Sequence, residues 1–595
     1  MSQAAPKGCS FLIQDVGNEE IFCPEKFSEE QHMFAQTARD FMEREVLPHV
    51  EAMEHGDFDK MVELLKKSAE AGFLMMDIPE EYGGLGVDKS TSFIVTEYIS
   101  QYAAFSVTFG AHTGIGTLPL LLFGNHEQKT KWLPKLATGE LIAAYALTEP
   151  GSGSDAMAAK TKAVLDEDGE HYVLNGTKMW ITNAGFADLF TVFCQVDGTK
   201  FTAFLVERDR AGVDVGAEEK KMGIKGSSTR QLILEDVRVP KENLLGEIGK
   251  GHKIAFNILN IGRFKLGVGV AGAAKRAVGL AAKYAEERQQ FGQSLSEFGA
   301  IRAKLGDMAT QIYALESMAY RVAGYMDESL GALDTKAPDY IQKMMDAIEE
   351  YAVEDSIMKI VGSEVLDFVV DEAVQIHGGY GYSQEYEVER LYRDARINRI
   401  FEGTNEINRM LIPGTILKRT MKGELNLFEM IQKVEAELGS SKHATAPGQE
   451  DDPGLALEIF QTEQAKRVAV YAANQAIQKH MADLREQQEI LMDLADMIIQ
   501  VYLADSTVAR TQEVVRLKGA GASAPHRAAC RLAVSQAYQK TVGLAENLMA
   551  HLTHGEKLHA HLDNIARLAP RSRVDQIGMR RVVADAVVEK EKYPF

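Results

Sequence analysis

Cysteine and long apolar runs are scarce in this sequence of 595 residues. The four cysteines are widely separated and include no C-x-x-C pair, which supports neither a disulfide framework nor a zinc site; they are Cys9, Cys23, Cys194 and Cys530. No run reaches the roughly 18 uninterrupted apolar residues that a membrane-spanning helix needs. The sequence therefore predicts a protein without structural disulfides, without a metal site and without a transmembrane segment.

Positive charge is also in deficit. Lys and Arg number 65 against 86 Asp and Glu, which gives a formal net charge of −21 at pH 7. Such a field repels nucleic acid phosphates, so we expect no nucleic acid partner. The first residues have no apolar core behind a basic stretch and include Glu19 and Glu20, which argues against a transit peptide. We therefore expect the mature protein to begin here.

The remaining composition, with 45% hydrophobic and 25% charged residues, is that of a folded globular protein, and its periodicity divides the chain. Apolar residues recur three and four apart over 27–144, as in a helical domain. Short β-rich runs between Gly and Asp turns over 145–257 predict a small β domain. Long helical patterns over 258–423 predict a bundle. A helix and a polar, Gly-rich and Pro-rich linker over 424–454 lead to an additional helical domain over 455–595, with a break at GAGASAP.

The run GVGVAG at Gly267–Gly272 matches the G-x-G-x-x-G pattern of dinucleotide-binding loops. That fingerprint needs a strand that leads into a helix N-terminus, whereas the preceding AFNILNIGRF has a helical pattern. We therefore interpret the run as a small-residue helix face for close packing.

A more informative segment is YALTEPGSGSD, Tyr145 to Asp155, at the junction of the helical and β domains. Gly151 and Gly153 permit close approach of the backbone, and the hydroxyls of the segment can bind an anionic or heteroaromatic ligand. A polar loop without a ligand is the alternative. Some 25 residues on, Trp180 in KMWITNAG either belongs to such a site or packs into the core from an edge strand.

Two further segments contain residues suited to binding. R-x-x-F-G comprises Arg288, Phe291 and Gly292. In VQIHGGYGY, Gly378 and Gly379 at a helix end can present amides to a phosphate or cap the helix.

Glu402 is the candidate for acid–base chemistry. It lies in the segment RIFEGTNEINR beside the apolar Phe401, after two long helical patterns. Desolvation can raise the pKa of a carboxylate in such a place, which then serves as a general base. The alternative is an ordinary glutamate in a surface loop.

Together, the order and spacing of these segments resemble the acyl-CoA dehydrogenase family over roughly Glu29 to Met421. The matching motifs, in family order, are Y-x-x-T-E-P-x-x-G-S-D, K-x-W-I-T-N, GIKGSSTRQLILEDVRVP, R-x-x-F-G, Q-x-x-G-G-x-G and FEGTNEI. The resemblance implies a mainly α fold with a central β domain: an N-terminal helical domain, a β-barrel-like middle domain and a C-terminal helix bundle, followed here by an additional C-terminal α-helical domain. LNIGRF, KIVGSE and this extension are similar to the very-long-chain branch, whose members form homodimers.

The resemblance implies FAD-dependent α,β-dehydrogenation of a long- or very-long-chain acyl-CoA to trans-2-enoyl-CoA, the first step of fatty acid β-oxidation. Glu402 matches the family's base, which takes the α-proton while the β-hydride passes to the flavin; the base position of some other relatives is Gly262 here. In the family, the backbone N–H of the base and a ribityl hydroxyl of FAD stabilise the charge on the thioester oxygen. Electrons then pass to electron-transfer flavoprotein, and Trp180 suggests their path from the flavin.

The family's contacts carry over position by position. The residues around the flavin are Tyr145, Leu147, Thr148, Gly153, Ser154, Trp180, Ile181 and Thr182. Those implied to reach the adenosine diphosphate half of the neighbouring subunit's FAD are Arg288, Phe291, Phe298, Gln375, Ile376, Gly378 and Gly379. Thr404 and Glu406 flank the base and complete the cofactor set. The implied substrate contacts are Ser154, Asn260, Arg263 and Gly403, and Arg263 could alternatively hold the catalytic loop in place.

Substrate length and assembly follow from two further features. Gly110 and Ala111 fall where medium-chain relatives carry a larger polar residue at the pocket floor, so we expect a longer acyl tunnel. The final domain carries an apolar stripe at helical spacing, which we expect to pack on the bundle and to help limit assembly to a dimer; it comprises Ile490, Leu491, Leu494, Met497, Ile498, Val501 and Tyr502.

The implied location is the bacterial cytoplasm or, for a mature mitochondrial form, the matrix. The linker contains Lys442 and His443 with few apolar residues, so any membrane contact would be peripheral. Two other functions stay open: an acyl-CoA oxidase that reoxidises the flavin with O₂, and a flavoprotein-derived assembly or scaffold subunit. Retention of Glu402 and of every flavin segment argues against a purely structural role.

Overall fold

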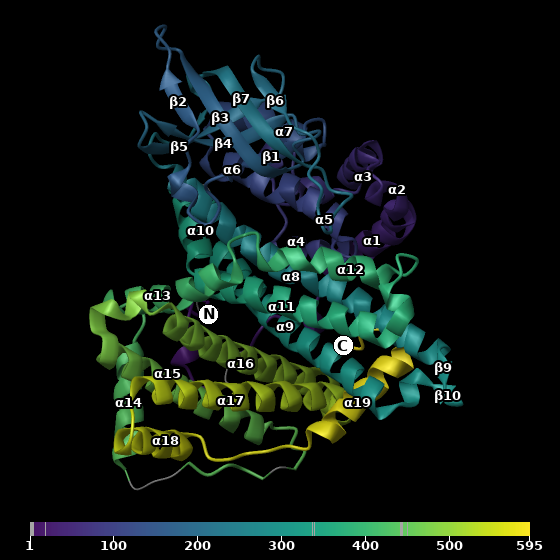
Figure 1. Ribbon diagram of the computed structural model, residues 1–595, viewed down its shortest axis with the longest axis vertical. Helices are drawn as coiled ribbons and strands as arrows, with labels where there is room; N and C mark the ends of the chain where they lie inside the picture. Colours follow the sequence, from purple (N-terminus) through teal and green to yellow (C-terminus); the bar gives the residue numbers. More distant parts are fainter. Residues whose placement is uncertain (1–4, 18–19, 336, 338, 441–443, 449) are drawn as a thin grey trace.

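The structure, a computed structural model, describes residues 5–17, 20–335, 337, 339–440, 444–448 and 450–595. Along its longest axis the β domain lies at one end, a helix bundle in the middle and the additional C-terminal helices at the other end (Figure 1). The N-terminal helices contact both the bundle and the β domain. This arrangement confirms the predicted fold, mainly α with a central β domain.

Four α-helices of the N-terminal domain begin at polar capping residues. Ser28 caps α1 and Asn125 caps α7 in capping boxes, each closed by a Gln three residues on. The side chains of Asp57 and Asp88 accept backbone N–H groups at the starts of α3 and α4. The helices and the connecting π-helical turn are α1 (Glu29–Phe41), α2 (Val50–Glu54), α3 (Phe58–Glu70), α4 (Lys89–Ile99), α5 (Ala103–Gly110), η7 (Ala111–Gly116), α6 (Leu118–Phe123) and α7 (His126–Ala137).

The strands of the middle domain form one sheet in the order β6-β7-β3-β2-β4-β5-β8, and β1 pairs in parallel with β4. They confirm the β-rich runs read from the sequence and are β1 (Ala143–Ala146), β2 (Lys162–Leu165), β3 (His171–Thr182), β4 (Leu189–Val196), β5 (Lys200–Glu207), β6 (Val213–Val215), β7 (Thr229–Pro240) and β8 (Leu244–Leu245). The segment that follows β1 runs beside the end of β3, where the Met179 N–H donates to the Thr148 carbonyl (2.8 Å). The two candidate ligand-binding segments are therefore neighbours.

The bundle follows the sheet, and its long helices pack closely through small residues. A Cβ atom on Gly267 of α8 would lie 2.7 Å from the carbonyl oxygen of Met358 in α11, and one on Gly272 would overlap the carbonyl oxygen of Glu97 in α4. These contacts confirm that GVGVAG is a packing face. The elements are α8 (Gly251–Glu287), β9 (Gln289–Gln290), β10 (Gln293–Ser294), α9 (Gly299–Gly331), α10 (Tyr340–Glu349), α11 (Ala352–His377), α12 (Glu387–Ala395), η12 (Arg396–Arg399) and α13 (Asn405–Met421).

Within the part of the chain that the structure describes, two segments are long and apolar enough to cross a membrane by length and composition alone: Ala103–Phe123 and Gly251–Glu287. In their most apolar windows, 78% and 67% of the residues are buried inside the protein. Core helices of globular proteins have this composition because they are covered by other elements.

The linker segment contains α14 (Leu427–Gly439), and the additional domain consists of α15 (Ala456–His480), α16 (Gln488–Ala522), α17 (Ala524–Leu552), α18 (Glu556–Leu568) and α19 (Gln576–Lys590). Every residue of the predicted apolar stripe is buried and belongs to one core with residues of α8, α9 and α11, which confirms the packing prediction. The expected break is confirmed at Gly519, whose φ of 77° ends the regular part of α16. Residues 441–443 and 449 of the expected linker, which include Lys442 and His443, lie outside the described residues.

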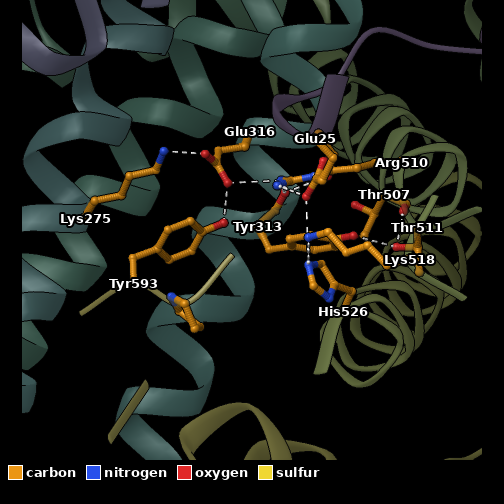
Figure 2. A network of polar contacts seen from close by, with 12 residues as sticks. Glu25, Lys275, Tyr313, Glu316, Thr507, Arg510, Thr511, Lys518, His526 and Tyr593 are labelled. Atoms are coloured by element: carbon orange, nitrogen blue, oxygen red, sulfur yellow. Dashed lines mark hydrogen bonds and ion pairs between the residues drawn. The ribbon is translucent and has the colours of Figure 1, made fainter. Parts of the chain in front are cut away.

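A buried network of charges joins the additional helices to the rest of the protein (Figure 2). The Arg510 guanidinium of α16 is fully buried and lies 2.9 Å from Glu25 in the N-terminal segment and 3.0 Å from Glu316 in α9. Lys275 of α8 and the hydroxyl of Tyr593, near the C-terminus, also bind Glu316. Opposite charges that share buried hydrogen bonds compensate one another's desolvation. The network therefore fixes segments that are far apart in sequence at one seam.

The four cysteines are buried and free. Burial raises the pKa of the Cys23 and Cys194 thiols to about 12, so they stay protonated and unreactive at neutral pH. Among the described residues, no group of three or more His, Cys, Asp or Glu side chains is arranged to hold a metal ion.

Candidate active site

The loop between η12 and α13 carries Glu402 in an uncommon backbone conformation. Glu402 and Gly403 both have positive φ angles, 58° and 79°. Glycine adopts this conformation freely, whereas a glutamate does so at a cost of about 1 kcal/mol or more, and only where the surroundings hold it. Thr404 then starts α13 by accepting the Ile407 N–H at its side chain (3.3 Å).

Three side chains hold this loop by its carbonyl groups. Arg263 of α8 donates from Nε to the Glu402 carbonyl (3.2 Å). Lys359 of α11 donates from Nζ to the Gly403 carbonyl (2.7 Å), and Asn408 of α13 donates to the same oxygen (2.9 Å). The loop conformation is thus set by contacts from three helices.

The carboxyl group of Glu402 is poised for proton transfer. Burial raises its pKa from 4.5 to about 7, although the positive charges of Arg263 and Lys359 act in the opposite direction. Its Oε2 atom is buried and has no hydrogen-bond partner among the described residues. A base with a pKa near the working pH and a free oxygen can accept a proton from a bound ligand.

Glu402 lies where two cavities meet. One, of about 170 Å³, is lined mainly by apolar and small residues of α4, α5, η7 and α8, including Gly110 and Ala111. The other, of about 760 Å³, is more polar and runs between β1, β3, α8 and α13. Phe401 and Thr182 line both cavities with Glu402. The arrangement suits a ligand whose reacting atoms lie at the carboxyl group, with an apolar chain on one side and a polar body on the other.

The residues expected around a flavin come together in the larger cavity. Its lining includes Tyr145, Leu147, Thr148, Gly153, Ser154, Trp180, Ile181 and Thr182. The hydroxyl of Tyr145 is buried and lacks a hydrogen-bond partner among the described residues. An added Cβ on Gly151 or Gly153 would meet no atom within 4 Å. A buried hydroxyl without a partner and open space beside the backbone leave both a hydrogen-bond donor and room for a bound heteroaromatic ring.

Trp180 does not pack into the core, which excludes the edge-strand alternative. Its surface is 53% exposed and its φ is 60°. The side chain therefore lies at the rim of the larger cavity, within reach of solvent and of a ligand.

The residues expected to contact substrate also converge. Asn260, Arg263 and Gly403 line the larger cavity together with Ser154. The Asn260 Oδ1 accepts from Arg263 Nη1 (3.0 Å), while Arg263 Nε reaches the Glu402 carbonyl. Arg263 thus has the loop-holding role that was the alternative for it.

A second group of expected cofactor residues lies elsewhere. None of its members lines either of the two cavities; they are Arg288, Phe291, Phe298, Gln375, Ile376, Gly378 and Gly379. They belong to the segments around β9 and β10 and to the end of α11, where the Arg288 guanidinium lies 5.6 Å from the centre of the Tyr380 ring and Phe291 is 95% exposed. Gly378, with φ 60°, caps α11.

Thr404 and Glu406 lie beside the base but do not line these cavities. Thr404 caps α13. Glu406 is exposed in the first turn of α13, where its own backbone N–H and the Thr404 side chain lower its pKa.

Sequence reasoning missed several residues of this site. Lys359 is the first residue of KIVGSE, and nothing in the neighbouring sequence marks it as a neighbour of Glu402. Lys418, Arg419 and Lys422 line the larger cavity at the end of α13. Three cations within five residues were a visible signal for an anionic ligand, but their position became clear only from the fold.

Comparison with known proteins identifies relatives over the whole chain. The sequence matches the acyl-CoA dehydrogenase N-terminal domain over 28–140, the middle domain over 144–237 and the C-terminal domain over 249–417; a further acyl-CoA dehydrogenase C-terminal domain matches 464–567. A probable acyl-CoA dehydrogenase of Bacillus subtilis is 49% identical over 587 residues, which cover 99% of this chain and 98% of the relative. The very long-chain specific acyl-CoA dehydrogenase of Macaca fascicularis mitochondria is 44% identical over 353 residues, 58% of this chain and 51% of the relative.

Two solved structures are similar. The crystal structure of an acyl-CoA dehydrogenase from Bacillus anthracis complexed with FAD has a TM-score of 0.96 and 48% identity, and the match covers 99% of this chain and 100% of the other. The structure of the electron transferring flavoprotein of Acidaminococcus fermentans has a TM-score of 0.60 and 37% identity, and the match covers 66% of this chain and 99% of the other.

Proposed function

This chain belongs to the acyl-CoA dehydrogenase family, and from that premise we propose that it converts long- or very-long-chain acyl-CoA to trans-2-enoyl-CoA in fatty acid β-oxidation, with Glu402 as the base. The observation that carries the proposal is the position of a carboxyl group with a pKa of about 7 at the junction of an apolar and a polar cavity. A thioester fits this junction because its acyl chain is apolar and its CoA portion is polar and anionic.

The enzyme is a FAD-dependent dehydrogenase. The larger cavity fits the cofactor, because the hydroxyl of Tyr145, which has no partner among the described residues, and the open space at Gly153 lie at a pocket of about 760 Å³. Tyr145, Thr148, Ser154 and Thr182 would hold and orient FAD there. When bound, FAD supplies the two-electron acceptor for the β-hydrogen of the substrate.

The residues of the chain carry out the proton transfer. The ionised carboxylate of Glu402 accepts the α-proton, and the electrons of the broken α-C–H bond form the new double bond as the β-hydrogen leaves as hydride. Arg263 and Lys359 hold the loop so that the carboxyl group stays at the junction. An added Cβ on Gly262 would lie 2.9 Å from Glu402 Oε2, so the glycine leaves the room that the carboxyl group occupies.

A long acyl chain is the finer part of the proposal. Gly110 and Ala111 line the apolar cavity, which continues between α4 and α8. Small residues along the cavity wall leave room for a long acyl chain, and similarity to very long-chain specific relatives supports the same interpretation. Lys418 and Lys422 at the end of α13 lie on the polar side, where they suit the phosphates of CoA, whereas Arg419 is paired with Glu350 of the same lining.

Electron-transfer flavoprotein is the proposed acceptor. Trp180 is exposed at the rim of the larger cavity and offers an aromatic path outward from the flavin. Oxygen consumption without an added acceptor would instead indicate the oxidase alternative, and a protein that binds no acyl-CoA would indicate the scaffold alternative.

A homodimer is proposed because the second group of cofactor residues, apart from the buried Ile376 and the half-buried Phe298, is exposed and lies away from the flavin cavity. A second copy could bring its Arg288 to the adenosine diphosphate half of FAD bound mainly by the first. We expect Arg288→Ala to weaken FAD retention and dimer stability together, because a guanidinium–pyrophosphate pair would link them. Stable dimers with unchanged FAD affinity would contradict this role.

Location and membrane contact are proposed as read from the sequence: the bacterial cytoplasm or the mitochondrial matrix, with at most peripheral contact with a membrane. Cell fractionation and sedimentation with anionic liposomes test both.

The central experiment is anaerobic reduction of the purified holoenzyme by saturated acyl-CoAs of short, medium and long chain. We expect the flavin absorbance to bleach fastest with long-chain substrates and the product to be the trans-2-enoyl thioester. Bleaching only with short chains would contradict the tunnel argument, and no bleaching with any acyl-CoA would contradict the proposed reaction.

A further inference from the structure

Lys359 connects the base loop to the first residue of α13. Its Nζ donates to the Gly403 carbonyl and to Asn405 Oδ1, each at 2.7 Å. Burial lowers its pKa to about 8, although the negative charges of Glu402, Glu406 and Glu364 act in the opposite direction, and the two acceptors hold the ammonium group in place. Asn405 therefore fixes the position of the cation nearest to the base on α11.

Asn405 is in turn held from α11. Its Nδ2 donates to Ser363 Oγ (3.0 Å) and to Glu364 Oε1 (3.1 Å). Glu364 accepts both Nη atoms of Arg409 in α13, at 2.8 and 3.0 Å. Such a two-point pair fixes both side chains in orientation as well as distance.

The last contact comes from the additional domain. Arg409 Nε donates to Asp496 Oδ1 of α16 at 2.9 Å. Arg409 has only 10% of its side chain exposed, and Asp496 has 22%. The donor atoms Nη1 and Nη2 thus bind an acceptor of the dehydrogenase bundle, and Nε binds one of the additional domain, so Asp496 adds a third point of contact to the two that Glu364 provides.

These contacts form a continuous series that we call the polar relay: Asp496, Arg409, Glu364, Asn405 and Lys359. We propose that Asp496 is a positioning residue for Glu402 and acts through the polar relay, so that the additional C-terminal domain takes part in setting the geometry of the base. This inference rests on the proposed function, in which Glu402 accepts the α-proton.

The charged groups that face Glu402 decide in which direction its pKa, and with it the pH profile of the reaction, moves in a variant. They are Arg263 from α8 and Lys359 from α11; the buried hydroxyl of Tyr145 from β1 also faces Glu402 but is neutral. Loss of a negative charge at position 496 by itself lowers the pKa of a nearby carboxyl group. Displacement of the Lys359 cation from the loop raises the pKa of Glu402 instead. Relay action and a through-space charge effect therefore move the pH profile in opposite directions.

The test is the limiting rate of anaerobic flavin reduction by a long-chain acyl-CoA, measured against pH for the FAD-loaded enzyme. For Asp496→Asn we expect a rate about three- to tenfold lower, the size found for residues coupled to a site without touching its ligand. We expect its acid limb at higher pH and an unchanged dissociation constant for acyl-CoA. Asp496→Glu, which keeps the charge, should restore most of the rate.

Asp493→Asn is the matched control. It removes the same charge one turn earlier on α16, and among the described residues Asp493 has no hydrogen bond or ion pair with Arg409. We expect its profile to follow the wild type. An Asp496→Asn profile that matches Asp493→Asn, or one that moves to lower pH, would overturn the proposal.

A double variant tests the route. Lys359→Met removes the last member of the polar relay, so we expect Asp496→Asn to cause no further shift in that background; additive shifts would refute action through the relay. Because the reaction is followed at the flavin absorbance, only protein that holds FAD contributes to the rate. Glu402→Gln distinguishes failure of the proposed function from failure of this inference. If that variant still reduces flavin at the wild-type rate, Glu402 is not the base, whatever the result for Asp496.

Discussion

Substituting Glu402 by Gln tests two properties of the carboxyl group separately: its role as the base, and the free energy that its ionisation costs the folded protein. Glutamine keeps the size and shape of the side chain but cannot accept a proton. We expect flavin reduction by acyl-CoA to fall by a factor of ~10³ or more, the usual size for loss of an essential general base. FAD content and acyl-CoA binding should remain, because the side chain makes no described contact that holds the cavity walls together.

The same substitution should stabilise the protein at alkaline pH. Burial raises the pKa of Glu402 from 4.5 to about 7, so ionisation costs about 3 kcal/mol more in the folded protein than in the unfolded chain. A raised folded-state pKa gives stability that is fully present below the unfolded value and is lost as pH rises through the folded value. Glu402→Gln cannot ionise, so it should exceed the wild type by up to about 3 kcal/mol above pH 7 and match it below about pH 4.

Two measurements on the FAD-loaded protein check this: stopped-flow flavin reduction, and urea unfolding as a function of pH. Glu354→Gln is the matched control. Burial also raises the pKa of Glu354 to about 7, and its carboxyl group accepts the Cys9 N–H (2.6 Å), but it lines neither cavity. It should show a similar gain in stability at alkaline pH with flavin reduction close to the wild-type rate.

Two results would refute the reasoning. Flavin reduction within about tenfold of the wild type in Glu402→Gln would show that another group accepts the proton. Equal unfolding free energies of wild type and Glu402→Gln at every pH would show that the carboxyl group is not desolvated in solution.

Three further predictions concern the tunnel, the seam and the additional domain. In Gly110→Leu the new side chain enters the apolar cavity, so kcat/KM should fall for long-chain acyl-CoA and change little for short-chain acyl-CoA. The control Gly543→Leu in α17 also places leucine in open space and should leave the chain-length preference unchanged. An unchanged preference in Gly110→Leu would refute the tunnel. Arg510→Met leaves the carboxylates of Glu25 and Glu316 without their shared cation, so urea unfolding should show a loss of about 3–5 kcal/mol, and a loss below about 1 kcal/mol would contradict the role of the network. The seam should also weaken in acid: burial alone raises the pKa of Glu25, but Arg510 lowers it to about 2, so its stabilisation, present above the unfolded value, is lost as pH falls toward 2. Deletion of 438–595 uncovers apolar faces of the bundle, so light scattering should show aggregates; a soluble, fully active dimer with no change in liposome binding would refute this.

Much of the fold is local information and could be read from the sequence. The β-rich runs, the helical spacing and the break at Gly519 each depend on residues within one turn or strand of one another. The same holds for GVGVAG, where the helical pattern before the glycines excluded a dinucleotide loop. Glu402 was found because its segment has a recognisable order of residues and an apolar neighbour.

The properties that make Glu402 useful were decided by the tertiary structure. Its pKa depends on desolvation by several elements and on the charges of Arg263 and Lys359, which come from two other helices. Electrostatic interactions depend on distance in space and on burial, and neither is encoded in sequence spacing. The sequence suggested that desolvation could raise this pKa; the fold determined that it does, and to what value.

Long-range contacts show most clearly which properties follow from the sequence and which depend on the tertiary structure. The sequence alone determined that the additional domain has a buried apolar stripe, because periodicity shows which face is hydrophobic. Only the tertiary structure brought Arg510 to Glu25, 485 positions away in the chain, and Asp496 to Arg409, 87 positions away. A charged residue's partner is selected by geometry and by the need to compensate desolvation, so the side chains at the seam between the additional domain and the bundle acquire their roles only once the chain has folded.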